Sequence, residues 1–564
     1  MEHIKLFKNF IRLIQKMKKH IILTIAISSI FLCSCNDGFL DVPPLDVVTN
    51  DTFWESEEQL ILALNGLYGN VKAKNTVDME NLGDNTLWPS TTAYQQIGSG
   101  NFGNDLGTLN TEWTTQYRAI RQANAFLENY QRADMDPVRR EALAGEARVI
   151  RALGYLFLTS FFGDVPLVTT TLTVEEVFVP RTPRAEVVEF ILNDLDLAAE
   201  NLSAEIPSGP RLGRMSKGAA LALKARIALY NGMYEVAEDA AKEVMDLGVY
   251  QLFDQGNPET NYNNLFNYTG RQANGLNKET IIARLHLPDL VLHNLSREIQ
   301  VPDQVARWNP TKSLVDSYLM IDGLPIDKSP LYSENGYNEV FQNRDPRMTQ
   351  TILAPGAQWG GRFDGRAVNT NPEIFMEPKF NNDRRGSVTI TGYYFTKYAE
   401  LSTIGLVGRD HNDIHLIRYA EVLLTYAESR FELGKLTQQD IDMTINLLRD
   451  RVGMKRMDLN ELAENGMDLR EEIRRERRVE LALEGQRYFD LLRWEQGPVL
   501  AEDVKGMKKA WASNQSHVAN FAEDQDGYIV AFSGRNFVSP RNYLWPIPLP
   551  QLERFPDLGQ NPGW

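Results

Sequence analysis

Small and apolar residues recur at helical spacing along much of this chain. Between residues 216 and 247 they fill one face of a helix, Asn231-Gly232 interrupts the pattern, and a second helix follows that ends at Gly248. Two antiparallel helices in about 32 residues, with small side chains at the contact, are typical of a tetratricopeptide-like hairpin. A generic helical pair would give the same pattern and remains the alternative.

The same spacing returns elsewhere and predicts further helices. A second, looser pair is expected over 416–433 and 440–452, and repeated pairs favour a solenoid in which each unit buries its face against the next. We therefore expect a mostly α fold on a scaffold of tetratricopeptide-like helical hairpins. The other predicted helices cover about 111–132, 138–162 with a stop at Gly163, a stretch that begins near Arg184, and about 468–496.

Residues 251–412 have a different texture. Pro, Gly, Asn, Asp and aromatic residues dominate there, with short strand-like runs such as Gly392–Tyr398. Stretches of this length without regular structure are uncommon in compact domains unless they are functional. We expect a loop-rich layer with a few short β-strands, packed on the helical scaffold.

The first 35 residues have the layout of a secretory signal. A basic cluster precedes an apolar run from Ile21 to Leu32, and Cys35 follows. The run is too short to cross a hydrocarbon core, which needs about 20 residues, but it suits the apolar region of a signal peptide. Leu32 and Ser34 ahead of the cysteine resemble a bacterial lipoprotein signal. We expect residues 1–34 to be removed and Cys35 to be lipidated; an ordinary signal peptide with a chance cysteine is the alternative.

Two details of this segment matter. Met17 opens a complete signal peptide by itself, so we expect translation to start there and Met1–Lys16 to be an upstream extension or a long leading region. After cleavage Cys35 is the only cysteine left, so no disulfide is possible. Because one acyl chain anchors weakly, stable attachment takes two or more.

Charge excludes one class of function. The 564-residue chain is long enough for a large core, and without residues 1–34 its formal net charge is −21. Such a balance repels nucleic acid, so we expect no nucleic-acid partner. The chain has only seven histidines, none paired at metal-ligand spacing, which argues against a histidine metal site.

Several aromatic residues stand in polar, aperiodic stretches, where they are candidates for ligand binding. Aromatic planes complement the flat C–H faces of sugar rings, and neighbouring amides and carboxylates bond sugar hydroxyls. The alternative for each aromatic is that it caps the core beneath a loop. The candidate ligand-binding residues are Trp88, Tyr94, Trp308 and Trp359, with Asp84 and Asn81 near the first two.

Three other patterns resemble functional motifs but are better explained as structural features. Glu421, Glu428 and the carboxylates of the run from Glu476 to Glu480 alternate with arginines, which favours structural ion pairs between helices over acid–base catalysis. Gly98–Gly103 has the letters of a nucleotide fingerprint without the strand and helix that it needs, and Asp524–Gly527 is only a fragment of a calcium loop. We predict turns at both places, and no catalytic residue, metal or cofactor.

An ordered set of segments, from the lipid cysteine to the last residues, resembles the SusD/RagB family of nutrient-uptake outer-membrane lipoproteins. Each segment is weak alone, but their order is specific. They include Phe39-Leu40-Asp41, Leu64-Asn65-Gly66-Leu67-Tyr68, Phe162-Gly163-Asp164-Val165-Pro166, Asn343-Arg344-Asp345-Pro346-Arg347, Glu476-Arg477-Arg478-Val479-Glu480 and Gln560-Asn561-Pro562-Gly563.

The resemblance implies a fold and a role. About four tetratricopeptide-like pairs form the scaffold, and the protein sits lipid-anchored on the cell surface as the lid of a SusC-like TonB-dependent β-barrel transporter. Members bind oligosaccharides or peptides and are not enzymes. The motifs also imply packing roles for Trp54, Trp113, Trp494 and Trp545, whereas the positions of the family's ligand aromatics vary.

On this basis the chain divides into a signal peptide at 1–34, an N-terminal region with helical pairs at 35–250, a ligand- and transporter-facing region at 251–412, and a C-terminal region at 413–564 that completes the scaffold. Two rival functions stay open. A surface hydrolase of glycans or peptides would turn over its substrate, and a purely structural or adhesive scaffold would bind neither a small ligand nor a transporter.

Overall fold

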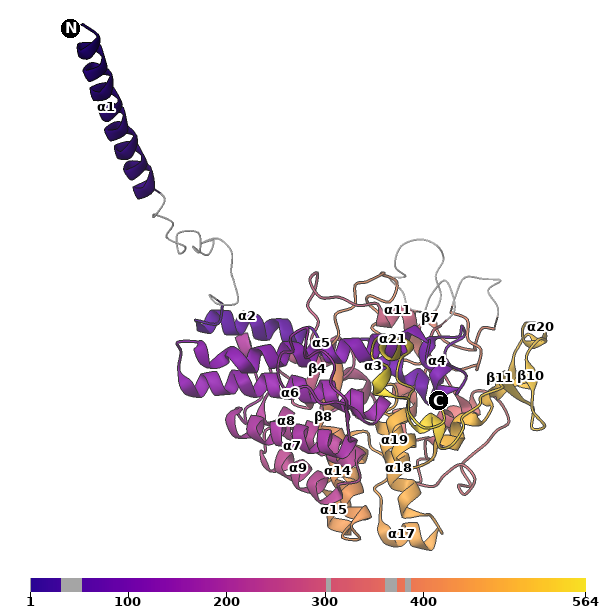
Figure 1. Cartoon of the computed structure of the whole chain (residues 1–564). Coiled ribbons are helices and arrows are strands. Elements are labelled where there is room, and N and C mark those ends of the chain that lie inside the picture. The colour runs from indigo at the N-terminus through magenta and orange to yellow at the C-terminus, as the bar shows by residue number, and fades with distance from the viewer. Residues whose placement is uncertain (1, 32–52, 301–305, 361–372, 381–386) are drawn as a thin grey trace.

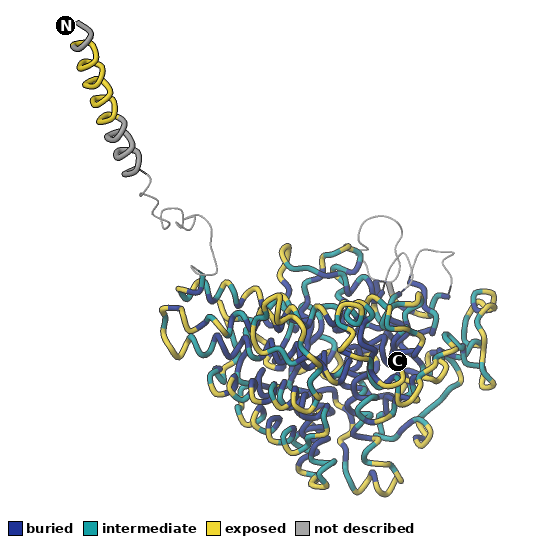
Figure 2. The backbone as a smooth tube through the Cα atoms, viewed as in Figure 1, coloured by how far each residue is buried: buried dark blue, intermediate teal, exposed yellow. Residues whose placement is uncertain are grey.

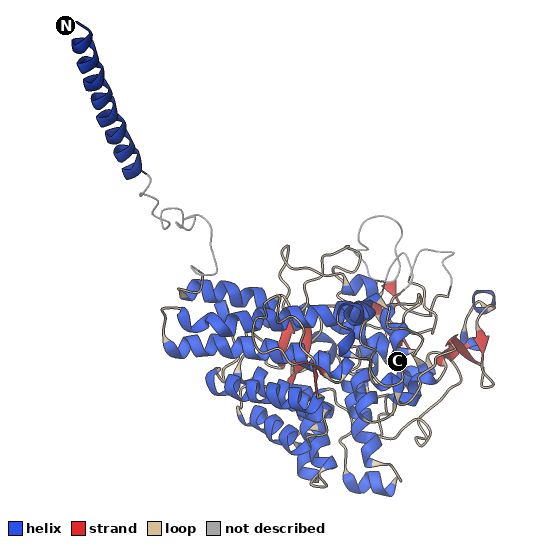
Figure 3. Cartoon of the chain, viewed as in Figure 1, coloured by secondary structure: helices blue, strands red, loops and turns tan. Residues whose placement is uncertain are grey.

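The computed structural model describes residues 2–31, 53–300, 306–360, 373–380 and 387–564. Within these residues the chain is mostly helical, and its strands form only small sheets of two or three strands (Figures 1 and 3). The expected mostly α fold is confirmed. Buried residues run through the whole body in two main clusters, one among the long helices and one under the irregular segments (Figure 2).

The N-terminal helix α1 spans Glu2–Phe31 and contains most of the predicted signal region. Its residues 5–20 are exposed. Cys35, the predicted lipidation site, lies outside the described residues. Among the helices that the structure describes, none combines the length and the apolar character that crossing a membrane requires.

Long helices packed in sequence order form the scaffold. Each packs against the next, and α9 packs against α14 across a wide gap in sequence. Figure 1 shows α5 to α9 as a layered stack with α14 beside it. Their bounds are α2 (Glu57–Tyr68), α5 (Gly107–Asn129), α6 (Pro137–Phe162), α7 (Arg184–Asn201), α8 (Lys217–Tyr230), α9 (Tyr234–Asp246) and α14 (Tyr419–Glu432).

Local signals set the ends of these helices. The side chain of Asp136 accepts a hydrogen bond from the backbone N–H of Arg139, and Pro137 occupies the first helical turn of α6, where its missing N–H costs nothing. Gly163 ends the same helix with a φ of 74°, a conformation that favours glycine. The predicted helix and its stop are confirmed.

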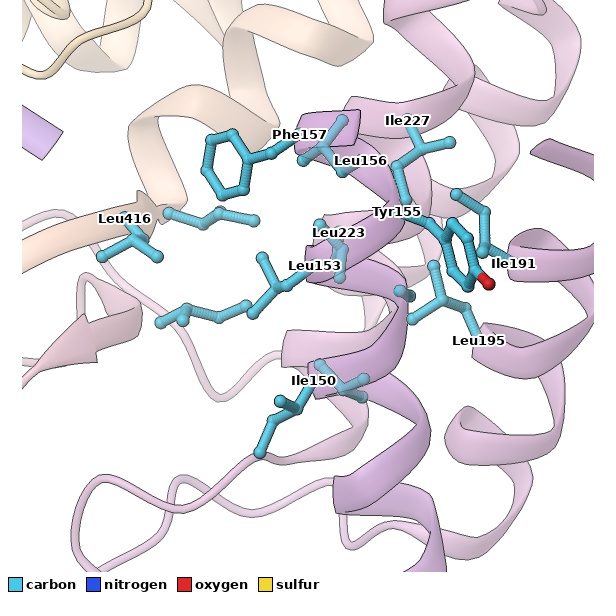
Figure 4. Close-up of a cluster of buried hydrophobic side chains, with 14 of the residues drawn as sticks. Ile150, Leu153, Tyr155, Leu156, Phe157, Ile191, Leu195, Leu223, Ile227 and Leu416 are labelled. Carbon is cyan, nitrogen blue, oxygen red and sulfur yellow. The ribbon is translucent and has the colours of Figure 1, made fainter. Parts of the chain in front are cut away.

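The core of the scaffold lies where α6 meets its neighbours. Small residues fill α8, so its backbone approaches the helices on either side closely. Figure 4 shows side chains from these helices meeting in one apolar cluster. The labelled members are Ile150, Leu153, Tyr155, Leu156 and Phe157 on α6, Ile191 and Leu195 on α7, Leu223 and Ile227 on α8, and Leu416.

The expected helix over 416–433 is wrong at its start. Residues Ile414–Arg418 form strand β8, which pairs antiparallel with β4 (Thr280–Arg284), and α14 begins only at Tyr419. All five residues of β8 are buried, so the run has no polar face that would have distinguished a strand from a helix. The partner helix is also divided, into α15 (Gln438–Asp442) and α16 (Ile445–Arg451).

The single helix expected over 468–496 is wrong as well. The structure has α18 (Leu469–Glu480), a turn, and α19 (Arg487–Arg493). Leu483 and Gly485 have φ values of 65° and 70°, which no α-helix contains. A Cβ atom at position 485 would overlap the backbone oxygen of Thr76, so a segment distant in sequence sets this turn.

A layer of short elements covers the scaffold, as expected for 251–412. The predicted strand Gly392–Tyr398 is wrong: only Phe395 forms a bridge, to Ile352. The other helices are α3 (Asn75–Asp78), α4 (Ala93–Gly98), α10 (Asn261–Asn264), α11 (Leu295–Ile299), α12 (Lys312–Ser317), α13 (Pro346–Thr351), α17 (Leu459–Glu464), α20 (Gln515–Val518) and α21 (Leu549–Arg554).

Small sheets pin this layer in place. β1 (Thr86–Leu87) pairs with β5 (Asn309–Pro310), and the two join segments more than two hundred residues apart. β9, β11 and β10 form a three-stranded sheet in which Asp524–Gly527 is a turn, as predicted. The remaining strands are β2 (Val165–Pro166), β3 (Arg181–Thr182), β6 (Gln358–Trp359), β7 (Glu373–Ile374), β9 (Val504–Lys508), β10 (Ala522–Glu523) and β11 (Tyr528–Phe532).

A buried ion-pair cluster joins the layer to the C-terminal helices. Glu480 accepts from Arg418 at 2.7 Å, from Arg451 at 2.8 Å and from Arg347 at 3.0 Å. The carboxylates of the C-terminal run are therefore paired, which confirms the structural interpretation of this charge pattern. The members of the cluster are Glu279, Arg347, Lys397, Arg418, Arg451, Glu480 and Glu484.

Candidate functional site

Trp88 is the most open of the tryptophan candidates. It directly follows β1, and Trp308 directly precedes β5, so the pairing of these two strands brings the rings together. The ring centroids are 5.0 Å apart and the planes are inclined by 50°. Trp308 is fully buried and Trp88 is half-buried, so a rigid indole supports a partly open one. We name this pair the tryptophan platform.

Charged side chains border the platform. The guanidinium of Arg307 lies 5.5 Å from the centroid of the Trp88 ring, and the ammonium of Lys74 lies 4.9 Å from that of Trp308. Glu298 forms ion pairs with both cations. Cations near aromatic rings are attracted by the ring quadrupole, and the shared carboxylate holds both in position. The platform therefore offers an aromatic surface with hydrogen-bond donors beside it.

The indole N–H of Trp308 is buried and has no hydrogen-bond partner among the described residues. Buried donors are normally satisfied, and leaving one unpaired costs about 1–3 kcal/mol. The Trp308 ring itself has no exposed surface, so this residue supports the platform and does not offer a free face.

Tyr94 lies elsewhere. Its hydroxyl donates to Oε1 of Glu112 at 2.6 Å, and Lys72 pairs with the same carboxylate at 2.8 Å. Burial and the neighbouring Glu112 carboxylate raise the pKa of Tyr94 well above its ordinary value. The ring packs against the core of the long helices, whereas Trp88 packs against the second core.

Asp84 and Asn81 are buried, and neither side chain is on the platform. Arg487 and Arg478 pair with Asp84 at 2.7 and 3.0 Å. Burial favours the neutral acid, but these two guanidinium groups outweigh it and hold the pKa of Asp84 well below its usual range. Asn81 donates to the backbone oxygen of Asp78 at 3.1 Å.

Trp359 is a core residue. Its ring is 5.1 Å from that of Phe375 and 5.3 Å from that of Tyr394, and it is almost fully buried. The structure thus brings Trp88 and Trp308 together and places the other four candidates apart from them. The expected packing tryptophans Trp54, Trp113, Trp494 and Trp545 are all buried, as predicted.

A polar pocket of about 500 Å³ lies beside Asp84, and no sequence pattern indicated it. Arg475 and Arg478 on α18, Arg535 from the C-terminal segment, Ser313 on α12 and Tyr528 on β11 line it. We name it the arginine pocket. Its walls come from separate segments, so no local motif marks it. A second, more apolar groove of about 410 Å³ lies between α5, residues 166–179 and α21.

Metal and nucleotide chemistry find no support in the described residues. These residues include no group of three or more His, Cys, Asp or Glu side chains arranged to hold a metal ion. The Gly98–Gly103 segment follows helix α4, not a strand, and Gly100 sits in a turn with a φ of 74°. The predicted turn is confirmed.

A helical-hairpin scaffold covered by a loop-rich layer, with an aromatic platform and a polar pocket in that layer, defines the class of this protein. Residues 299–564 match the model described as "SusD family", and residues 38–229 match the one described as "Starch-binding associating with outer membrane". The chain belongs to the SusD/RagB family.

Relatives cover nearly the whole chain. A SusD-like protein of Formosa agariphila is 25% identical, over 97% of this chain and 100% of its own length. The crystal structure of a SusD-like carbohydrate-binding protein from Bacteroides fragilis has a TM-score of 0.77 and 28% identity, covering 90% of this chain and all of that one. A laminarin-binding SusD-like protein shares the fold, with a TM-score of 0.62, 21% identity, and coverage of 91% and 100%.

Proposed function

We propose that this chain is a non-catalytic glycan receptor that works at the bacterial cell surface. Family membership supports the proposal, as does the similarity to a solved protein whose name states that it binds carbohydrate. The observation that carries it is the tryptophan platform. Trp88 is only half-buried, and Trp308 and Arg307 pack against its ring.

The chemistry of the platform suits a sugar. An indole face packs against the C–H groups of a pyranose, while Arg307 and Lys74 donate to ring and hydroxyl oxygens. Because the supporting side chains are buried or ion-paired, ligand binding orders little that is not already ordered. A receptor that hands its ligand on needs modest affinity, and we expect Kd values of about μM to mM.

Non-catalytic capture is favoured over the rival hydrolase by the state of the carboxylates. Glu421 and Glu476, which resembled parts of a catalytic constellation, each pair with a buried arginine, and Glu428 pairs with the partly buried Arg493. A general acid needs a raised pKa, and the arginine beside Glu428 holds its pKa below the ordinary value although burial opposes this.

A panel of oligosaccharides and peptides immobilised on one array tests the proposal. The full chain should retain one or more glycans, and Trp88→Ala should weaken the retained interaction about tenfold or more, since a central tryptophan often dominates binding. Trp511→Ala is the matched control, because Trp511 is also half-buried and packs on the same core. Binding only to peptides, or equal losses in both variants, would contradict the proposal.

The proposal includes a lipid anchor on Cys35 and delivery to a SusC-like TonB-dependent transporter. The family model described as associating with the outer membrane supports the location, and the partner follows from the family resemblance. Deleting the transporter gene should abolish uptake of the glycan while leaving its capture at the surface intact. Uptake that continues without the transporter would refute the pairing.

A further inference from the structure

We infer that the arginine pocket is a second sugar site, one that accepts an anionic substituent, the carboxylate or sulfate of an acidic glycan. This rests on the proposed glycan-binding function and assigns a ligand class to a separate place in the molecule. The pocket lies beside the β1–β5 ladder, which also carries the tryptophan platform. Asp84 is four residues ahead of Trp88, and β1 lies between the two.

Three guanidinium groups in this pocket keep N–H donors to spare. Arg478 donates through Nε to Asn85 and through Nη2 to Asp84 and Ser313. Its Nη1 has no hydrogen-bond partner among the described residues. Arg535 donates only through Nη2, to the backbone oxygens of Gly83 and Gly98. It forms no ion pair within the part of the chain that the structure describes.

Arg475 completes the set. Its Nε donates to Glu472 at 3.2 Å and its Nη1 to the backbone oxygen of Ser317 at 3.4 Å, which leaves Nη2 without a protein acceptor among the described residues. A guanidinium group matches the geometry of a carboxylate or sulfate because two parallel N–H bonds reach two oxygens. An anionic group entering the pocket would meet donors on three arginine side chains, two from α18 and one from the C-terminal segment.

The carboxylates of the inner wall already have partners in the protein. Asp84 is shared by Arg478 and Arg487, and Asp316 pairs with Lys312. Burial, reinforced by the neighbouring Arg487, lowers the pKa of Arg478 to about 10, and burial also lowers the pKa of Arg535. Both shifts indicate guanidinium groups that lack full compensation, which a bound anion would provide.

The remaining walls suit a polyhydroxylated body. A cavity of about 500 Å³ is in the size range of small-ligand sites. The Ser313 hydroxyl faces the pocket beside Arg478, and Glu502, Asp503 and Asp526 stand exposed at its rim. Carboxylates accept from sugar hydroxyls but repel a second anion, so the pocket selects a ligand with a single acidic group inside and neutral hydroxyls outside.

Calorimetric titration of the purified full chain tests the inference with three probes: a disaccharide that carries one galacturonate and one galactose, its neutral methyl ester, and a galactose disaccharide that carries one sulfate. We expect at least one of the two acidic probes to bind about tenfold or more tighter than the ester, with an affinity that falls as salt rises. The stronger of the two identifies the substituent as carboxylate or sulfate. Inorganic sulfate is the fourth titrant; binding of sulfate as tight as that of the sugars would overturn the sugar assignment.

Two variants with opposite expected effects on the affinity for the acidic probe make the test specific. Arg535→Gln removes donors without breaking an ion pair and should weaken the acidic probe about tenfold, while Arg118→Gln, an exposed arginine on α5, should change nothing. The double substitution Glu502→Gln with Asp503→Asn removes repulsion at the rim and should tighten binding severalfold. Because both rim residues are exposed, this variant should fold normally.

The binding results distinguish a failure of this inference from a failure of the proposed function. If neutral glycans bind at the tryptophan platform and acidic ones show no preference, the arginine pocket is purely structural and the inference is overturned. If no glycan of any charge binds, both are overturned. If Arg535→Gln weakens the binding of the acidic probe and of the neutral ester equally, the pocket does not recognise the negative charge.

Discussion

Arg418 on strand β8 donates to Glu480 at the end of helix α18 at 2.7 Å, and both side chains are fully buried. This contact links the strand that lies beside the loop-rich layer to the helix that ends the scaffold. Arg418 also pairs with Glu279 and Glu484 at 2.7 and 2.8 Å, so one guanidinium connects three segments. The layer that carries both proposed sugar sites is therefore attached through buried charge as well as through apolar packing.

Arg418→Met should destabilise the fold by about 3–5 kcal/mol, because it leaves the carboxylates of the cluster buried without their partner. The matched control is Arg456→Met, since Arg456 pairs with Asp450 at 2.6 Å on the surface, where such pairs contribute about 0–1 kcal/mol. Urea unfolding followed by circular dichroism measures both. Equal midpoints for the two variants would show that the buried cluster does not hold the layer.

Acid should weaken the same cluster. Burial raises the pKa of Glu484, but Arg418 and Lys397 outweigh it and lower the pKa to about 2, from an ordinary value of 4.5. A carboxyl group whose pKa is lowered on folding contributes stability that is fully present above pH 4.5 and is lost as the pH falls towards 2. The free energy of unfolding should therefore decrease across that range.

The substitution Glu484→Gln checks this assignment. It should lower stability at neutral pH and flatten the decrease between pH 4.5 and 2, because its amide cannot titrate. Glu464→Gln is the control, since Glu464 is exposed on α17, and it should leave the profile unchanged. A pH profile with the same slope in wild type and Glu484→Gln would assign the acid sensitivity to other groups.

Gly485 should tolerate no side chain. Its φ of 70° strains any L-residue by about 1–2 kcal/mol, and a Cβ atom would also overlap the Thr76 carbonyl. We expect Gly485→Ala to cost about 3 kcal/mol or more. Gly434→Ala, at a φ of 67° with open space around it, should cost only about 1 kcal/mol. Thermal melts of the two variants separate backbone strain from the steric overlap.

The helices were predictable where their ends are set locally. Asp136-Pro137 and Gly163 bound α6 by capping and by backbone preference, and the sequence shows both. The break between α18 and α19 was not predictable, because it depends on the close approach of Thr76 to Gly485. Strand β8 was missed for a similar reason: its partner β4 is more than a hundred residues away, and no polar face marks it as a strand.

Some residues of the candidate site could also be predicted from the sequence, and others could not. The composition around Trp88 and Trp308 marked both as candidates, but only the pairing of β1 with β5 decides that Trp88 is partly open and that Trp308 lies beneath it. Trp359 stood in an equally polar stretch and is a core residue. The arginine pocket had no signal at all, since Arg475 and Arg535 meet only after the C-terminal segment folds back.

The anchor has its own test. Mass spectrometry of the mature protein should find acyl chains on Cys35, and Cys35→Ala should move the protein from the membrane fraction to a soluble one, since stable attachment takes two or more chains. Ser34→Ala is the control at the neighbouring position, where a small residue is retained and attachment should persist. An unmodified Cys35 in a membrane-bound protein would contradict lipid anchoring.

Capture without cleavage is the central claim, and a single calorimetric titration with a glycan retained on the array tests it most directly. After the titration the sugar is recovered from the calorimeter, and its chain length is measured. The account predicts saturable binding in the μM to mM range that Trp88→Ala weakens about tenfold, and sugar of unchanged length. Shortened sugar, or undiminished binding by Trp88→Ala, would contradict it.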